Sequence, residues 1–128
     1  MSSYIRFQTG MRCRDTGRSL GIFHAAGRLQ DDGNVEPYLA DSLESTLHWF
    51  NSNLSVPKKD RIHWRCLFWF DCESAEVIGK VWELITWLRL HELFVQAYRC
   101  DAPGKIMYAD SHQCAAIPSQ RVRRVLKL

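Results

Sequence analysis

The chain has 128 residues, of which 46% are hydrophobic and 24% are charged, and its net charge is +3. This length and balance are typical of one globular domain and exclude a mainly disordered chain. No stretch approaches the ~18 uninterrupted apolar residues that a membrane-spanning helix needs, and the N-terminus lacks the apolar segment of a signal peptide. We therefore expect a cytoplasmic protein that does not enter a membrane.

The five cysteines are odd in number and include no Cys-x-x-Cys pair. Reduced thiols in the cytosol fit this pattern better than a disulfide framework. The histidines form no His-Glu-x-x-His pair, and no glycine-rich phosphate-binding loop is present. We therefore predict no metal ion and no cofactor.

The N-terminal half predicts one strand followed by two helices. Residues 3–9 alternate between two faces, which is the period of a β-strand. Asp15 or Thr16 can cap a helix over residues 17–30, although glycines weaken it. Pro37 suits the first turn of a second helix. The buried side of that helix is marked by apolar residues at spacings of three and four: Leu39, Leu43, Leu47, Phe50 and Leu54.

The C-terminal half predicts a strand, a third helix and three further strands. Residues 62–70 are the most β-prone run of the chain and end as an apolar block, as in a strand covered on both faces. We expect the third helix over about residues 74–91, capped by Asp71 or Ser74. The last three strands are expected at residues 94–100, 105–109 and 113–117.

The predicted order, β-α-α-β-α-β-β-β, indicates an α/β or α+β fold with about three helices packed on a mixed sheet of about five strands. The strand–helix–strand unit over residues 62–100 predicts a right-handed parallel crossover, and the last strands predict antiparallel hairpins. We expect residues 1–118 to form a single domain and residues 119–128 to form a basic C-terminal tail.

The positive charge belongs to that tail. Four of the 17 basic residues lie in the last ten positions, so residues 1–118 carry 13 basic residues against 14 acidic ones. Nucleic-acid binding would use arginines that contact phosphates. The arginines that suggest it are Arg12 and Arg14, with Arg6 and Arg18 nearby, and Arg121, Arg123 and Arg124 in the tail. A tail that docks on a partner and a tail without a role are the other two interpretations.

Two segments suggest a catalytic site. Cys72 lies in a turn between a predicted strand and helix, where α/β proteins often bind ligands and where a thiol can become a nucleophile. Tyr108, Asp110 and His112 lie within five residues of one another and could transfer protons. Helix caps and tight turns favour the same residue types for structural reasons. A small enzyme would therefore require the two segments to come within hydrogen-bonding distance.

Aromatic residues suggest a different function. Five tryptophans and six phenylalanines are many for this length. Trp49 and Trp87 do not fit the apolar stripes of the predicted helices, so we expect them to be exposed and to anchor a partner. Because no set of catalytic residues converges in the sequence, the leading hypothesis is a protein-interaction module that binds another protein or forms a homodimer.

Several segments resemble a family of small uncharacterised bacterial proteins. The shared features are a Trp-Phe-Asn motif at residues 49–51, an Asn-Leu-x-Val-Pro exit at residues 53–57 and a Gly-x-Ile-x-Tyr-x-Asp-x-His-Gln segment at residues 104–113. The resemblance covers nearly all of residues 4–118. It implies a bacterial, cytosolic origin and places the basic tail outside the shared domain, but it implies no activity, cofactor or partner.

Overall fold

The computed structural model describes residues 3–15, 17, 19–33, 35–55, 66–118 and 126–127. The chain divides into two compact units, each assembled from separate segments. Unit 1 comprises residues 1–6, 54–78 and 97–128, and unit 2 comprises residues 7–53 and 79–96. Three elements contribute residues to both units: β1 (Tyr4–Arg12), α3 (Ala75–Leu90) and β4 (Val95–Cys100).

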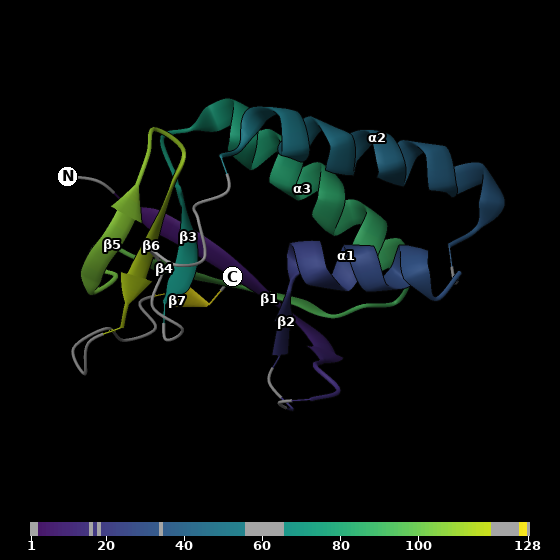
Figure 1. Ribbon diagram of the computed structural model, residues 1–128, viewed down its shortest axis with the longest axis horizontal. Coiled ribbons are helices and arrows are strands. Elements are labelled where there is room, and N and C mark those ends of the chain that lie inside the picture. The colour runs from purple at the N-terminus through teal and green to yellow at the C-terminus, as the bar shows by residue number, and fades with distance from the viewer. Residues whose placement is uncertain are drawn as a thin grey trace. The chain divides into compact units, whose positions relative to one another are not determined.

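Unit 1 contains a β-sheet in which β6 (Gln113–Ile117) lies between β5 (Lys105–Ala109) and β3 (Leu67–Asp71) (Figure 1). The strand order is β5-β6-β3-β1-β4-β7, where β7 is Leu126–Lys127. All the strand pairs with a described register are antiparallel. The pairing of Phe70 with Gln113 aligns the end of β3 with the start of β6, and this alignment positions the site described below.

One side of this sheet has a small apolar cluster. Trp69, Cys100 and Cys114 are buried in it. Three partly buried side chains pack against them: Tyr4, Leu67 and Tyr98. The guanidinium carbon of Arg6 lies 5.6 Å from the centre of the Trp69 ring, which is a cation–π contact.

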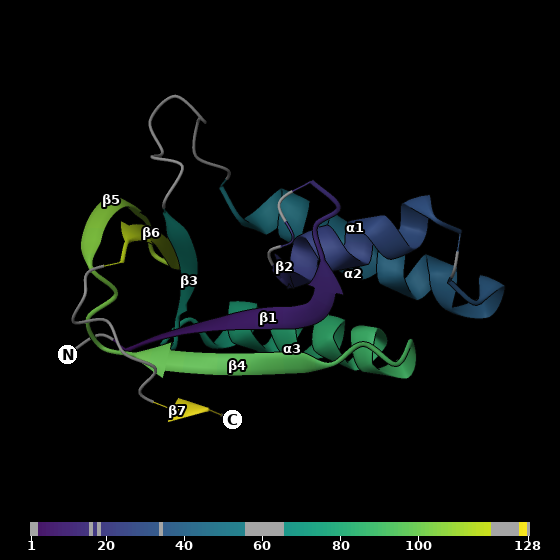
Figure 2. The same ribbon diagram turned by 90° about the horizontal axis from the view of Figure 1, so that it is seen from below.

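Unit 2 packs α1 (Ile22–Asp31), α2 (Pro37–Asn53) and most of α3 together. The rings of Phe23 and Phe50 meet edge to face, with centroids 4.8 Å apart, and join α1 to α2. Phe7 of β1 meets Trp82 of α3 in the same geometry at 5.4 Å. In Figure 2, β1 and β4 run side by side along most of their length.

The predicted fold class and element order are confirmed, with three helices and a sheet in the expected sequence. The second helix begins at Pro37, and the third spans Ala75–Leu90 within one residue of each predicted end. The antiparallel pairings favour the α+β form of the prediction. The predicted strand over residues 62–70 is β3, which begins at Leu67; residues 56–65 lie outside the described part.

The start of the first helix was predicted wrongly. α1 begins at Ile22, its N-cap is Gly21, and no side chain caps it, so Asp15 is not its cap; Thr16 lies outside the described residues. Residues Ser19–Gly21 instead form β2, which pairs with β1. The Thr9 hydroxyl donates a hydrogen bond to the Leu20 carbonyl at 2.8 Å and helps to hold this short strand.

The strand–helix–strand unit is present, but its two strands are not neighbours. β1 lies between β3 and β4, so the strands that α3 connects do not pair with each other. The division into a domain over residues 1–118 and a tail over residues 119–128 stays a prediction, because most of the tail is outside the described residues. No helix in the described residues is long and apolar enough to span a membrane.

Candidate functional site

The turn between β3 and α3 is shaped by Asp71. Its carboxylate oxygen Oδ1 accepts a hydrogen bond from the Glu73 amide at 2.9 Å, and its carbonyl accepts one from the Ser74 amide at 3.1 Å. The Ser74 carbonyl accepts the amide of Ile78, which places Ser74 at the N-cap position of α3. The predicted capping residues therefore lie at the helix start.

The Ser74 hydroxyl contacts a histidine, in addition to lying at the N-cap position of α3. Ser74 Oγ lies 2.7 Å from His112 Nδ1, and the His112 carbonyl accepts the Asp71 amide at 2.8 Å. The two residues are 38 positions apart in the sequence, and the pairing of β3 with β6 brings their turns together. The two turns therefore come within hydrogen-bonding distance through Ser74 and Asp71, whereas the predicted nucleophile Cys72 is not part of the contact.

Asp110 holds the β5–β6 turn that carries His112. Its carboxylate accepts hydrogen bonds from the Tyr108 hydroxyl at 2.7 Å, the His112 amide at 2.8 Å and the Gln113 amide at 3.0 Å. The Gln113 side-chain amide also donates to the Ser55 carbonyl at 2.6 Å. Asp110 therefore fixes the backbone of His112, while its described bonds do not reach the imidazole ring.

This bonding changes the acidity of two groups. Burial alone would raise the pKa of Asp110, but the hydrogen bonds from Tyr108, His112 and Gln113 outweigh it and lower the pKa below its usual value. The same Asp110 carboxylate raises the pKa of the Tyr108 hydroxyl, because the hydrogen bond stabilises the protonated phenol. Asp110 is therefore an anion, and Tyr108 is a neutral donor, around neutral pH.

Cys72 is not bonded to His112 in the described residues. Its thiol accepts a hydrogen bond from the Ser3 hydroxyl at 3.4 Å, and its amide donates to the Ser3 carbonyl at 2.9 Å. Burial raises the pKa of Cys100, and it raises that of Cys114 to about 11, so both thiols stay protonated. Within the described residues, no group of three or more His, Cys, Asp or Glu side chains could hold a metal ion.

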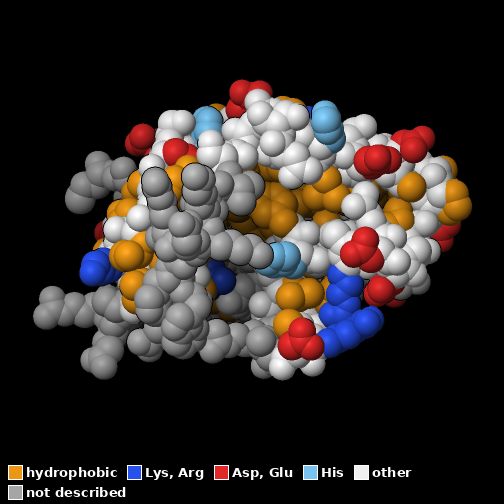
Figure 3. All heavy atoms as spheres, in the orientation of Figure 1, with side chains coloured by type: hydrophobic (Ala, Val, Ile, Leu, Met, Phe, Trp, Pro, Cys, Tyr) orange, Lys and Arg blue, Asp and Glu red, His pale blue; other side chains and the backbone are white. Residues whose placement is uncertain are grey.

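Three of the predicted phosphate-binding arginines lie in the described residues, and each has a contact within its own unit. In unit 2, Arg12 donates to the Gly17 carbonyl at 3.1 Å, and Arg14 forms an ion pair with Asp32 at 3.7 Å. Figure 3 shows basic and acidic side chains interspersed near α1. In unit 1, burial lowers the pKa of Arg6, which makes a cation–π contact with Trp69. Four of the named arginines lie outside the described residues: Arg18, Arg121, Arg123 and Arg124.

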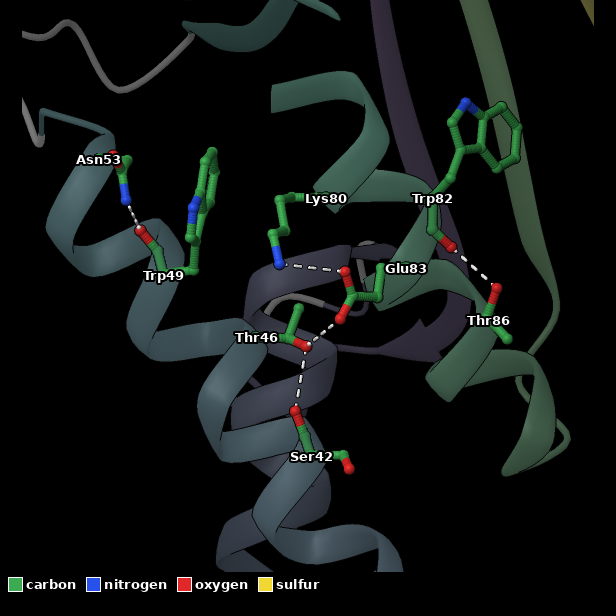
Figure 4. A network of polar contacts seen from close by, with 8 residues as sticks. All are labelled: Ser42, Thr46, Trp49, Asn53, Lys80, Trp82, Glu83 and Thr86. Atoms are coloured by element: carbon green, nitrogen blue, oxygen red, sulfur yellow. Dashed lines mark hydrogen bonds and ion pairs between the residues drawn. The ribbon is translucent and has the colours of Figure 1, made fainter. Parts of the chain in front are cut away.

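Trp49 and Trp87, the predicted anchors, are both half-buried. Trp49 meets Phe50 edge to face at 5.3 Å, and the Lys80 ammonium lies 5.7 Å from the centre of its ring. Lys80 also pairs with Glu83 at 3.3 Å (Figure 4). These contacts give Trp49 a structural role between α2 and α3, although part of its ring remains accessible.

The most exposed side of α3 carries apolar residues that sequence reasoning did not single out as a surface. Trp82 is 38% exposed, and Leu90 is 60% exposed. Ser74 was named only as a helix cap. A spacing of four residues between Trp82, Thr86 and Leu90 is visible in the sequence, but a serine and a histidine in distant turns leave no such pattern.

In comparisons with protein-family models, curated proteins and solved structures, no family, relative or fold matched the chain. The resemblance to small bacterial proteins therefore stays a prediction.

Proposed function

We propose that the protein is an interaction module that binds a protein partner through the exposed side of α3 in unit 2. The surface, named here the α3 stripe, consists of Trp82, Thr86 and Leu90. The observation that carries the proposal is the exposure of large apolar side chains on this helix, since Leu90 is 60% exposed and Trp82 38% exposed. A partner that covers them removes apolar area from water.

The geometry of the helix makes the stripe continuous. Residues four positions apart lie on the same side of an α-helix, so Trp82, Thr86 and Leu90 follow one another along α3. The Thr86 hydroxyl donates to the Trp82 carbonyl at 2.9 Å. Because that hydroxyl is already bonded within the helix, Thr86 can present its methyl group to a partner without leaving a polar group unpaired.

Contacts with α2 hold the stripe in place. Glu83, next to Trp82 in sequence, accepts a hydrogen bond from the buried Thr46 hydroxyl at 3.1 Å and pairs with Lys80 (Figure 4). Trp82 itself points away from this network and packs its ring on Phe7. A surface on a rigid helix loses little conformational entropy on binding, which favours affinity.

The composition of the stripe supports a protein partner over a polyanion. Tryptophan and arginine are enriched at the centres of protein interfaces, and the exposed Arg89 lies on the same helix as Trp82 and Leu90. Both signs of charge flank the stripe, since Glu83 is also exposed. Another protein or a second copy of this chain would fit these properties.

A photo-reactive benzoylphenylalanine at position 86, irradiated in the cells that make the protein, tests the proposal. We expect one discrete cross-linked product, and we expect Leu90→Ser in the same chain to reduce it at least about tenfold, the effect of losing a central apolar contact. The control carries the photo-reactive residue at position 38, because Tyr38 is 78% exposed but lies on α2 outside the stripe. Equal cross-linking at positions 38 and 86, or no effect of Leu90→Ser, would contradict the proposal.

A further inference from the structure

The contact between Ser74 and His112 has the geometry of a nucleophile with its general base. The two atoms, Ser74 Oγ and His112 Nδ1, lie 2.7 Å apart, within the range over which a histidine accepts a serine proton. Both residues are half-buried, in unit 1, and come from turns at the ends of paired strands. The pair is partly open to solvent rather than sealed in the core.

The surrounding hydrogen bonds fix both partners. The amide of His112 donates to Asp110 and its carbonyl accepts from Asp71, so the backbone of the histidine is held on both sides. Ser74 is held by the bond from its amide to the Asp71 carbonyl. Such bonds orient the reacting groups before a substrate binds, which is how a rigid scaffold contributes to catalysis.

The start of α3 supplies a second requirement of nucleophilic catalysis. Ser74 is the N-cap residue, so the amides of the first helical turn and the positive end of the helix dipole lie next to its hydroxyl. Negative charge that develops on an oxygen beside Ser74 would be stabilised there. The serine, the base and the N-terminal turn of α3 all belong to unit 1.

We propose that Ser74 and His112 form a catalytic pair that hydrolyses small activated esters. In the first half of the reaction, Ser74 Oγ attacks the acyl carbon and its proton passes to His112 Nδ1. The bond from the acyl carbon to the leaving oxygen then breaks, and His112 returns the proton to the departing alcohol. In the second half, water attacks the acyl-serine, gives a proton to His112 and releases the acid, and Ser74 recovers its proton.

The substrate class follows from the groups around the histidine. Among the hydrogen bonds of the described residues, none joins a carboxylate to the His112 imidazole ring, and Asp110 is bonded to the His112 backbone amide. A carboxylate on the ring orients the base and stabilises its charged form in serine hydrolases. Without one, the pair suits esters whose alcohol leaves readily rather than amides. This inference does not depend on the α3 stripe.

Labelling with an alkyl fluorophosphonate tests the pair. Formation of the bond between Ser74 Oγ and phosphorus is balanced by loss of fluoride, and the serine proton passes to His112. We expect intact-protein mass spectrometry to show one added phosphonyl group and peptide mapping to place it on Ser74. Labelling should disappear in Ser74→Ala and fall at least about a hundredfold in His112→Gln, as expected when a general base is lost. Ser111→Ala is the control that should label normally.

A measurement on the unaltered protein tests the proposal even if the variants do not fold. With p-nitrophenyl acetate, we expect a burst of one nitrophenol per chain and an acetyl group on Ser74. A label on other residues, no label at all, or unchanged labelling of a folded His112→Gln protein would overturn the proposal. Because Ser74 lies outside the α3 stripe, labelling of Ser74 and cross-linking from position 86 report on the two proposals separately.

Discussion

Asp110 accepts hydrogen bonds from four donors around the β5–β6 turn: the Tyr108 hydroxyl, the backbone amides of His112 and Gln113, and the Gln113 side-chain amide. A charged acceptor makes these bonds stronger than neutral ones. The hairpin that carries His112 therefore depends on the ionised form of Asp110.

We expect Asp110→Asn to lower the free energy of unfolding by about 1 to 2 kcal/mol at pH 7, since charge-assisted bonds are replaced by neutral ones. The folded state lowers the pKa of Asp110, so its contribution is fully present above the unfolded value of 3.8 and is lost as the pH falls through the lower folded value. Urea unfolding between pH 2 and 7 measures this, with exposed Asp101→Asn as the control. If the free energy of unfolding of Asp110→Asn fell at acid pH as much as that of the unaltered protein, the assignment to Asp110 would be wrong.

Glu92 ends α3 in a conformation that normally favours glycine. Its φ is 62°, in the left-handed region. The Glu92 amide donates to the Arg89 carbonyl at 3.0 Å, and the Leu93 amide donates to the Leu88 carbonyl at 3.1 Å. These two bonds form a Schellman motif with a glutamate at the position usually held by glycine.

Glu92→Gly is therefore expected to stabilise the protein by about 1 kcal/mol, because the strain of a side chain in the left-handed region is removed. Thermal and urea unfolding measure the change. Glu92→Ala keeps the Cβ atom and should give little or no gain. If both variants behave alike, the strain at this position is not significant.

At the scale of residues, the sequence indicated which side chains have reactive chemistry but not which side chains they contact. Asp110, His112 and Cys72 were identifiable from their chemistry. The contact of His112 with Ser74, instead of Cys72, depends on the register of β3 against β6, in which Phe70 faces Gln113. A one-residue shift would turn these side chains to the other face, and a single sequence does not report register.

At the scale of elements, the β5–β6 hairpin requires a glycine at its entry. Gly104 has a φ of 115°, and a Cβ atom there would collide with the backbone carbonyl of Ile117 at the end of β6. Only glycine combines this conformation with such a close approach.

We expect Gly104→Ala to destabilise the protein by at least about 2 kcal/mol, because it adds both strain and a clash with rigid backbone. Gly79→Ala is a matched control, for which we expect the opposite change in stability. Gly79 lies in α3 with open space where the methyl group of an alanine would lie, so alanine should stabilise by about 0.5 to 1 kcal/mol. Denaturant unfolding of both variants checks this pair, and a neutral Gly104→Ala would show that the hairpin can shift.

Elements with strong local patterns were predictable, and those that depend on distant partners were not. α2 and α3 show apolar residues at helical spacing, and Pro37 marks the start of α2. β2 has three residues and exists because it pairs with β1, so no local pattern reports it. Its formation also moved the start of α1 from residue 17 to Ile22.

At the scale of the whole molecule, the two proposed sites each lie within a single unit. The Ser74–His112 pair belongs to unit 1, and the α3 stripe belongs to unit 2. The number of aromatic residues led to the hypothesis of a protein partner, and the α3 stripe offers a surface for one. Nucleic-acid binding through Arg12, Arg14 and the basic tail stays a prediction, which would show as binding that weakens steeply with salt.

Native mass spectrometry of the protein, purified at moderate salt from the cells that make it, tests the interaction most directly. We predict a discrete added mass that equals a second protein or a second copy of the chain, and its loss in Leu90→Ser. Leu90 is 60% exposed, so this substitution should change stability by no more than about 0.5 kcal/mol and leave the fold intact. A bare monomer for the unaltered chain, or a complex that survives Leu90→Ser, would contradict the account.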